Sequence, residues 1–171
     1  SVGEDVFSYD DVKEDIVKIV ANAQSKLYKA DLIRDMEFKE GCIFEDNPFL
    51  IEVILKAERI YFLDEFLYLK RVRKDSITSS NDERFVDIIP IANTIIDLTK
   101  KYSKYDELKH AVINKKIRRI FIRYDQIDEQ YKQYFFERIK EDFNLRKDEY
   151  EDVLNVILFL LHVINLDILF R

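Results

Sequence analysis

The sequence has very little glycine and proline. Its 171 residues include two of each, Gly3 and Gly41, and Pro48 and Pro90. Sheet-rich folds need glycine at tight turns, and loops that cradle phosphates need it where the backbone approaches the ligand. The scarcity therefore predicts a mainly α fold, and it excludes a Walker loop or a dinucleotide-binding loop within this chain.

Cysteine, histidine and excess positive charge are also scarce. The single cysteine, Cys42, excludes an internal disulfide and a cysteine-based zinc site. His110 and His162 lie far apart in the sequence without ligand-like neighbours, which disfavours a metal site. The net charge of −6 disfavours nucleic acid as a partner of the whole chain. The acidic first fifteen residues are not typical of a signal peptide, so a cytoplasmic location is expected.

Apolar residues recur at helical spacing along most of the chain. They predict helices over 10–27, 29–35, a segment from Asn47 or Pro48 to about Ala57, 84–100, a segment opened by a capping box of Ser103 and Asp106, 128–143 and 148–170. Residues 60–63 and 66–72 are rich in Ile, Tyr, Phe and Leu, which predicts a short β-hairpin near residues 60–72. The expected fold is mainly α and bundle-like, with this hairpin.

The last expected helix is very apolar between Val153 and Phe170. Asn155, His162, Asn165 and Asp167 interrupt it, and a central aspartate is costly in a bilayer. A buried bundle helix or a homodimer helix is therefore favoured over a membrane span.

An ordered series of motifs runs from Lys26 to Thr78. It begins with Lys26-Leu27-Tyr28, continues to Phe44-Glu45-Asp46-Asn47-Pro48-Phe49, and closes with Leu67-Tyr68-Leu69-Lys70-Arg71 and Ser76-Ile77-Thr78. This series resembles the second half of the catalytic domain in family 2 glycosyltransferases of the kind that build capsular and cell-wall polysaccharides. The resemblance covers about the first 80 residues. It divides the chain into an acceptor-side part, 1–80, and a helical C-terminal region, 81–171.

The resemblance implies an inverting transferase of the GT-A type. Asp46 would be the base that takes the proton from an acceptor hydroxyl, and the start of the following helix would favour its ionised form. Glu45 would help to position the acceptor, Arg71 would meet diphosphate oxygens, and Tyr68 and Lys26 would contribute to substrate binding. Each has a structural alternative: a helix cap for Asp46, a solvated carboxylate or an ion pair for Glu45 and Arg71, and packing or surface roles for Tyr68 and Lys26.

The sequence departs from the family pattern in three places. Ala23, Gln24 and Ser25 stand where an aromatic residue and asparagine are usual, and Lys70 replaces a tyrosine. No two aspartates are spaced by one residue, so the Asp-x-Asp motif that holds the metal and the diphosphate is not in this chain. We therefore expect a fragment of a longer enzyme that is inactive alone, binds no cofactor itself, and belongs to a parent using Mg²⁺ or Mn²⁺. The implied substrates are a nucleoside-diphosphate sugar and a glycan or lipid-linked acceptor.

A cluster of basic residues leaves other interpretations open. Its members are Lys115, Lys116, Arg118, Arg119 and Arg123. The cluster could be a solvated helix face, a peripheral contact with anionic lipid, or a nucleic-acid contact, the last disfavoured by the net charge. The main alternative to a transferase is a non-enzymatic helical interaction or dimerisation module that uses the apolar C-terminal helix.

Overall fold

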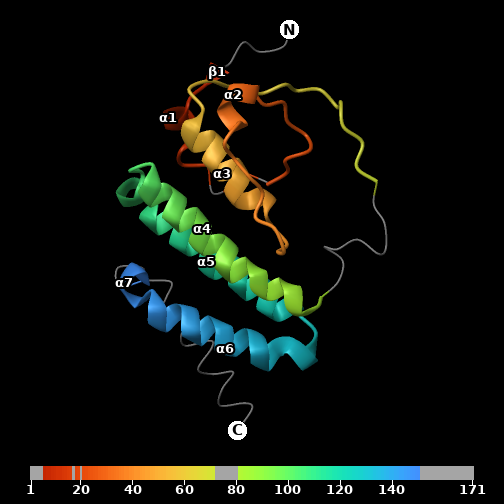
Figure 1. Cartoon of the computed structure of the whole chain (residues 1–171), viewed down its shortest axis with the longest axis vertical. Helices are drawn as coiled ribbons and strands as arrows, with labels where there is room; N and C mark the ends of the chain where they lie inside the picture. Colours follow the sequence, from red (N-terminus) through yellow and green to blue (C-terminus); the bar gives the residue numbers. More distant parts are fainter. Residues whose placement is uncertain (1–5, 17, 20, 72–80, 151–171) are drawn as a thin grey trace.

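The computed structural model describes residues 6–16, 18–19, 21–71 and 81–150 (Figure 1). These residues are mainly helical, which confirms the predicted fold class. The elements are, in order, β1 (Val6–Phe7), α1 (Tyr9–Val12), α2 (Ala30–Ile33), α3 (Asp46–Lys56), β2 (Ile60–Tyr61), the 3₁₀ helix η2 (Glu83–Asp87), α4 (Ile88–Lys101), α5 (Tyr105–Gln126), α6 (Glu129–Leu145) and α7 (Lys147–Tyr150).

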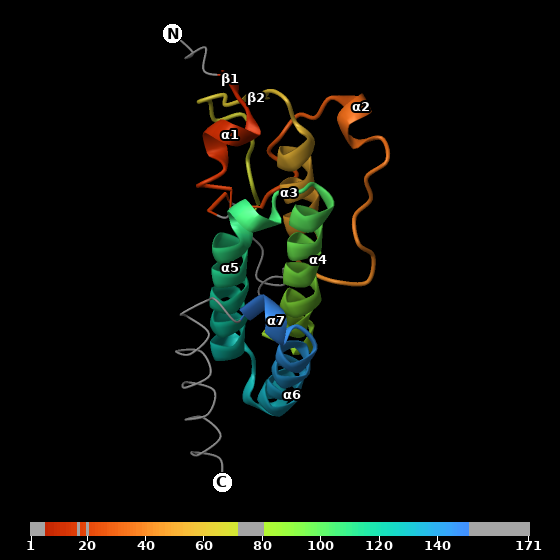
Figure 2. The same cartoon turned by 90° about the vertical axis from the view of Figure 1, so that its left-hand side faces the viewer.

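The core lies where α4 and α5 pack side by side. α3 packs against α4, and α6 lies on the opposite side of the α4–α5 pair from α3 (Figures 1 and 2). Apolar residues at helical spacing give α4 and α5 the stripes that make this packing favourable. Apart from Ile16, the side chains with almost no exposure come from η2, α4, α5 and α6 and include Phe85, Ile91, Ile96, Ile113 and Phe135.

The turn between α4 and α5 corrects the predicted capping box. Ser103 has a φ of 55°, its N–H donates to Lys100 O, and the N–H of Lys104 donates to Thr99 O. These two bonds form a Schellman motif, in which Ser103 ends α4 in the left-handed conformation. Lys104 is the N-cap of α5, and no side chain caps that helix. Ser103 therefore serves the end of one helix, not the start of the next.

The strand at residues 60–61 is present, but its partner differs from the predicted one. β2 pairs antiparallel with β1, in the register Val6 opposite Tyr61 and Phe7 opposite Ile60. Residues 66–71 form no strand with it, because Asp64-Glu65 is a poor turn pair for a hairpin. The extended segment 62–71 instead runs outside the helices (yellow in Figure 1), with Phe66 and Leu69 almost fully exposed.

The predicted helix over 10–27 is wrong for most of its length. α1 ends at Val12, and the described residues from 21 to 29 are not helical. The side-chain oxygen of Asn22 accepts the N–H of Gln24, and Lys26 Nζ donates to Asn22 O. Such local bonds offer the backbone an alternative to the helix ladder. Tertiary burial of Ile16 produced part of the apolar spacing without a helix.

The helices from residue 29 onward agree better with prediction. α2, α3 and α6 lie within the expected segments, give or take two residues at their ends. The segment expected from residue 84 begins as η2 and becomes α4 at Ile88, so Pro90 lies in the first turn, where no intrahelical partner is lost. α7 covers the start of the last expected helix, and residues 151–170 lie outside the described part. Among the described residues, no helix has the length and apolar character to cross a membrane.

Candidate functional site

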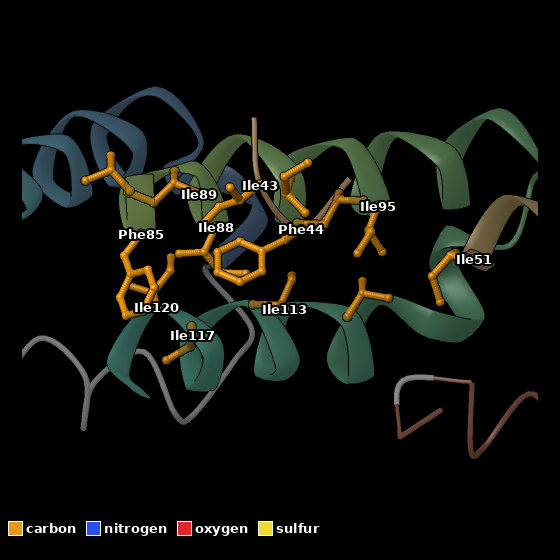
Figure 3. Close-up of a cluster of buried hydrophobic side chains, with 14 of the residues drawn as sticks. Ile43, Phe44, Ile51, Phe85, Ile88, Ile89, Ile95, Ile113, Ile117 and Ile120 are labelled. Carbon is orange, nitrogen blue, oxygen red and sulfur yellow. The ribbon is translucent and has the colours of Figure 1, made fainter. Parts of the chain in front are cut away.

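The candidate base Asp46 follows a tight and strained loop. Phe44 has a φ of 68°, a conformation that is rare for a bulky residue. Its ring is buried between α4 and α5, among Ile88 and Ile113 (Figure 3). The ring therefore anchors the loop in the core and holds the backbone in this conformation.

Hydrogen bonds fix the same loop from both sides. The N–H of Ile43 donates to Asp87 Oδ2 at 2.9 Å. The carbonyl of Phe44 accepts from both the N–H and Nδ2 of the buried Asn47, at 3.1 and 3.0 Å. Asn47 Nδ2 also donates to Asp46 Oδ1 at 3.0 Å. The carboxyl of Asp46 is thus held in a defined orientation at the first residue of α3.

Asp46 lies in an environment that raises its pKa. Burial is the largest cause and the neighbouring charge of Glu45 is the next, while Asn47 and the charge of Arg119 act in the opposite direction. The helix start was expected to favour the ionised form, but burial outweighs it. The result is a half-buried carboxylate that is more basic than an exposed aspartate.

Lys26 and Tyr28 lie close enough to Asp46 to feel its charge. Burial lowers the pKa of Lys26, and Asp46 partly opposes that change. Burial raises the pKa of Tyr28, and Asp46 adds to it. Tyr28 also packs its ring edge against Phe49 of α3, with the ring centroids 5.5 Å apart. The structure therefore places Lys26 and Tyr28 near Asp46, and the predicted role of Lys26 in substrate binding stays a prediction.

Glu45, Tyr68 and Arg71 complete the predicted set. Glu45 is the N-cap of α3, is half-buried, and its side chain does not cap the helix. Tyr68 and Arg71 are exposed and lie on the segment 62–71, which runs outside the helices (Figure 1). The predicted roles of these three residues remain predictions.

The basic cluster on α5 divides into two parts. Lys116 is 1% exposed and binds Asp142 Oδ2 and Asn93 Oδ1. Tyr150 also donates its hydroxyl to Asp142 Oδ2. Lys116 therefore belongs to a buried polar network between α4, α5, α6 and α7, and the interpretation of the whole cluster as a solvated face is wrong for this residue.

Lys115, Arg119 and Arg123 form the other part, four residues apart on α5. All three are half-buried, and the positive charge of Arg119 acts to lower the pKa of Asp46. Burial and the charge of Arg119 lower the pKa of Lys115 to about 8. The Arg123 guanidinium lies 4.9 Å from the ring centroids of both Phe44 and Phe85. Sequence reasoning had placed these residues in a basic cluster but had not connected them with Asp46.

A small cavity lies between α3, α4 and α5, and Lys115 and Arg119 are among the residues that line it. It has about 20 Å³ of room for the centre of a water-sized group, and about 310 Å³ of empty space when the part open to solvent is included. The polar residues lining it are Asn47, Lys115, Lys116 and Arg119, and the lining from α4 consists of Ile88, Ile91, Ala92 and Ile95. One water needs about 10–15 Å³ by this measure, so the enclosed part is too small for a nucleotide or a sugar ring.

No group of three or more His, Cys, Asp and Glu residues within the described ranges is arranged to hold a metal ion. Comparisons with protein families, with curated proteins and with solved structures found no match for this chain.

Proposed function

We propose that this chain is the acceptor-side part of an inverting glycosyltransferase in which Asp46 is the general base. The observation that carries the proposal is the setting of Asp46. Its carboxyl is half-buried, held by Asn47 after a strained turn, and has a pKa raised by burial and by Glu45. Strained backbone and raised carboxyl pKa values concentrate at functional sites. A residue that only began a helix would need neither.

The proposed reaction is the one that the resemblance implies, with this carboxylate as the base. Asp46 takes the proton of an acceptor hydroxyl, and the oxygen forms a bond to the anomeric carbon of the donor sugar. The bond between that carbon and the nucleoside diphosphate breaks, and the diphosphate leaves with the electron pair. A raised pKa makes the carboxylate a better proton acceptor near neutral pH. The positive charge of Arg119 limits the rise in the pKa of Asp46, which favours the ionised carboxylate.

The exposed segment 62–71 also supports membership in a larger domain. Phe62, Phe66, Leu67 and Leu69 are all well exposed on this extended segment. Strands that are apolar on both faces belong inside a covered sheet. In the proposed enzyme this segment pairs with strands of the donor-binding half, which brings Tyr68 and Arg71 toward the diphosphate.

The substrates of the proposed enzyme are a nucleoside-diphosphate sugar and a glycan or lipid-linked acceptor. The enzyme would work in the cytoplasm, with a peripheral contact at the membrane where the acceptor is lipid-linked. The chain alone is expected to be inactive.

The test is sugar transfer by the longer parent protein, with Asp46→Asn as the variant. Removing a general base lowers kcat by about 10²–10⁴-fold. Asp35→Asn is the matched control, because Asp35 is exposed and lies outside α3. Circular dichroism checks that both variants fold. A folded Asp46→Asn variant with transfer equal to that of the control would place the base elsewhere.

A non-enzymatic interaction module is the second candidate. The exposed apolar side chains of 62–71 favour it, because contiguous apolar patches mark interaction sites. A parent protein that transfers no sugar from any nucleotide donor would make this candidate the better one.

A further inference from the structure

The backbone of the segment 62–71 is almost unpaired within the described part of the chain. The segment follows β2 directly, but only Ile60 and Tyr61 pair with β1. Its one backbone hydrogen bond among the described residues runs from the N–H of Leu67 to Glu65 O, inside the segment itself. An exposed chain with free N–H and C=O groups is a template to which another strand can add.

The side chains of this segment are exposed, and apolar ones point to both faces when the chain is extended. Alternate residues of an extended chain lie on opposite faces. Phe66 and Tyr68 therefore share one face, and Leu67 and Leu69 share the other, with all four exposed. Contiguous exposed apolar side chains mark an interaction site. The partner that fits has to offer backbone groups for pairing and apolar side chains on both faces.

The charges of the segment make it complementary to a second copy of itself. Asp64 and Glu65 lie before the apolar residues, and Lys70 and Arg71 lie after them. All four are exposed, and none forms an ion pair with a described residue. Parallel pairing of two copies would place like charges opposite each other, which is destabilising. Antiparallel pairing instead brings the acidic end of each copy to the basic end of the other.

We propose that residues 63–71 pair antiparallel with the same residues of a second copy and form a symmetric dimer. A two-fold axis through the pair keeps each side chain on its own face, so one residue has to lie opposite its own copy. We place Leu67 on the axis. The opposite pairs are then Leu63 with Arg71, Asp64 with Lys70, Glu65 with Leu69, Phe66 with Tyr68, and Leu67 with its copy.

This register suits both faces of the paired segments. On one face Asp64 lies opposite Lys70 twice by symmetry, and the aromatic pairs of Phe66 with Tyr68 lie between them. Opposite-charge pairs and aromatic pairs across strands both stabilise a sheet. On the other face Leu67 packs against its own copy. Centring the pair on Tyr68 would place Phe66 opposite Lys70 and lose the first two kinds of pair.

The dimer is compatible with the rest of the fold. The segment runs outside the helices, so a second copy can approach it (Figure 1). The bond from Leu67 N–H to Glu65 O turns the chain locally, and pairing replaces it by cross-strand bonds. A strand has two edges, so the second edge remains for the donor-binding half of the proposed transferase. Dimerisation does not depend on the role of Asp46.

The test is sedimentation equilibrium of the whole chain. Two short strands pair only weakly in water, so the protein concentration is raised to about 1 mM. Asp64→Lys and Lys70→Asp should each weaken self-association by about tenfold or more, because each replaces an attractive pair by a repulsive pair twice in the dimer. A mixture of the two variants should associate again, because both pairs between them become attractive.

Asp35→Lys is the matched control, because Asp35 is exposed, lies outside the segment and changes the net charge equally. It should weaken self-association less than about twofold, and mixing it with Lys70→Asp should not restore association. Circular dichroism checks that all variants are folded.

A disulfide tests the register, in a Cys42→Ser background. Leu67→Cys should form an intermolecular disulfide on mild oxidation, because directly opposite residues have the Cα separation that a disulfide needs. Tyr68→Cys should form less, because its two copies lie diagonally. More disulfide at position 68 than at position 67 would overturn the register centred on Leu67.

Two results would overturn the dimer itself. A chain that stays monomeric at about 1 mM would mean that the partner of the segment is not a second copy. Self-association that neither Asp64→Lys nor Lys70→Asp weakens more than the control would place the interface elsewhere on the chain. Neither result bears on the proposed function, which Asp46→Asn tests separately through sugar transfer.

Discussion

Asp142→Asn should strongly destabilise the protein, because it breaks the buried network around Lys116. The side chain of Lys116 is 0% exposed and that of Asp142 is 8% exposed, so solvent cannot replace the lost partner. Removing one partner of a buried ion pair costs about 3–5 kcal/mol. The asparagine oxygen still accepts one hydrogen bond, so the lower end of that range, about 3 kcal/mol, is expected.

The pH dependence of this loss provides a second check. Burial lowers the pKa of Lys116 from 10.5, and Asp142 opposes the change. Without Asp142 the lowering becomes stronger. When the pKa of a lysine is lower in the folded state, the unfolded state binds more protons between the folded and unfolded pKa values. The free energy of unfolding therefore rises with pH in that range. The loss in free energy of unfolding caused by Asp142→Asn should therefore become smaller as the pH is raised from 7 toward 10.5.

The measurement is urea unfolding followed by circular dichroism at several pH values. Asp125→Asn is the control, since Asp125 is exposed, and it should change the free energy of unfolding by no more than about 0.5 kcal/mol. The double variant Lys116→Met with Asp142→Leu should be less destabilised than Asp142→Asn, because no unpaired charge remains. A loss below about 1 kcal/mol for Asp142→Asn would refute the reasoning from burial.

Two further predictions concern residues that oppose stability. Ser103→Gly should raise the free energy of unfolding by about 1 kcal/mol, because glycine adopts the left-handed conformation without the clash of a side chain. A loss of stability would instead show that Ser103 caps α5. Lys115→Gln should raise the stability at pH 7 by about 1–2 kcal/mol after allowance for solvent screening. The wild-type stability should rise between pH 8 and 10.5, where the unfolded state binds the extra proton, and thermal melts of Lys115→Gln should lack that rise. An equal rise in the variant would contradict the lowered pKa.

The sequence predicted elements whose signals are local. The start of α3 was found because proline in the first turn follows acidic and amide residues, which is a start signal within a few positions. The same local reasoning failed at residues 10–27. There the apolar spacing came partly from burial of Ile16 in the core, and an Asn22 side chain turned the backbone away from the helix.

Sequence motifs singled out only part of the candidate site. They pointed to Asp46, Glu45 and Lys26, whose roles stay predictions, and the structure places Lys26 near Asp46. Arg119 could not be assigned to the site, because its nearness to Asp46 depends on how α3 packs over α4 and α5. The sequence also did not show that Lys115 and Lys116 lie in different environments. They are adjacent in sequence and both line the cavity, but a helix turns each residue by about 100°, so only Lys116 reaches Asp142 and joins its buried network.

The two neighbouring lysines differ in their partners: Lys116 belongs to the buried network of Asp142, and Lys115 does not. Lys116 is buried with two hydrogen-bond acceptors, Asn93 and Asp142, whereas no described residue forms a hydrogen bond or an ion pair with Lys115 or Arg119. Asn47 lines the cavity and forms hydrogen bonds with Phe44, where the backbone is strained, and with Asp46, whose pKa is raised. Unfavourable features that could have been removed by single substitutions are thus gathered around one small site. Such a gathering is expected where function, and not stability, determines the residues.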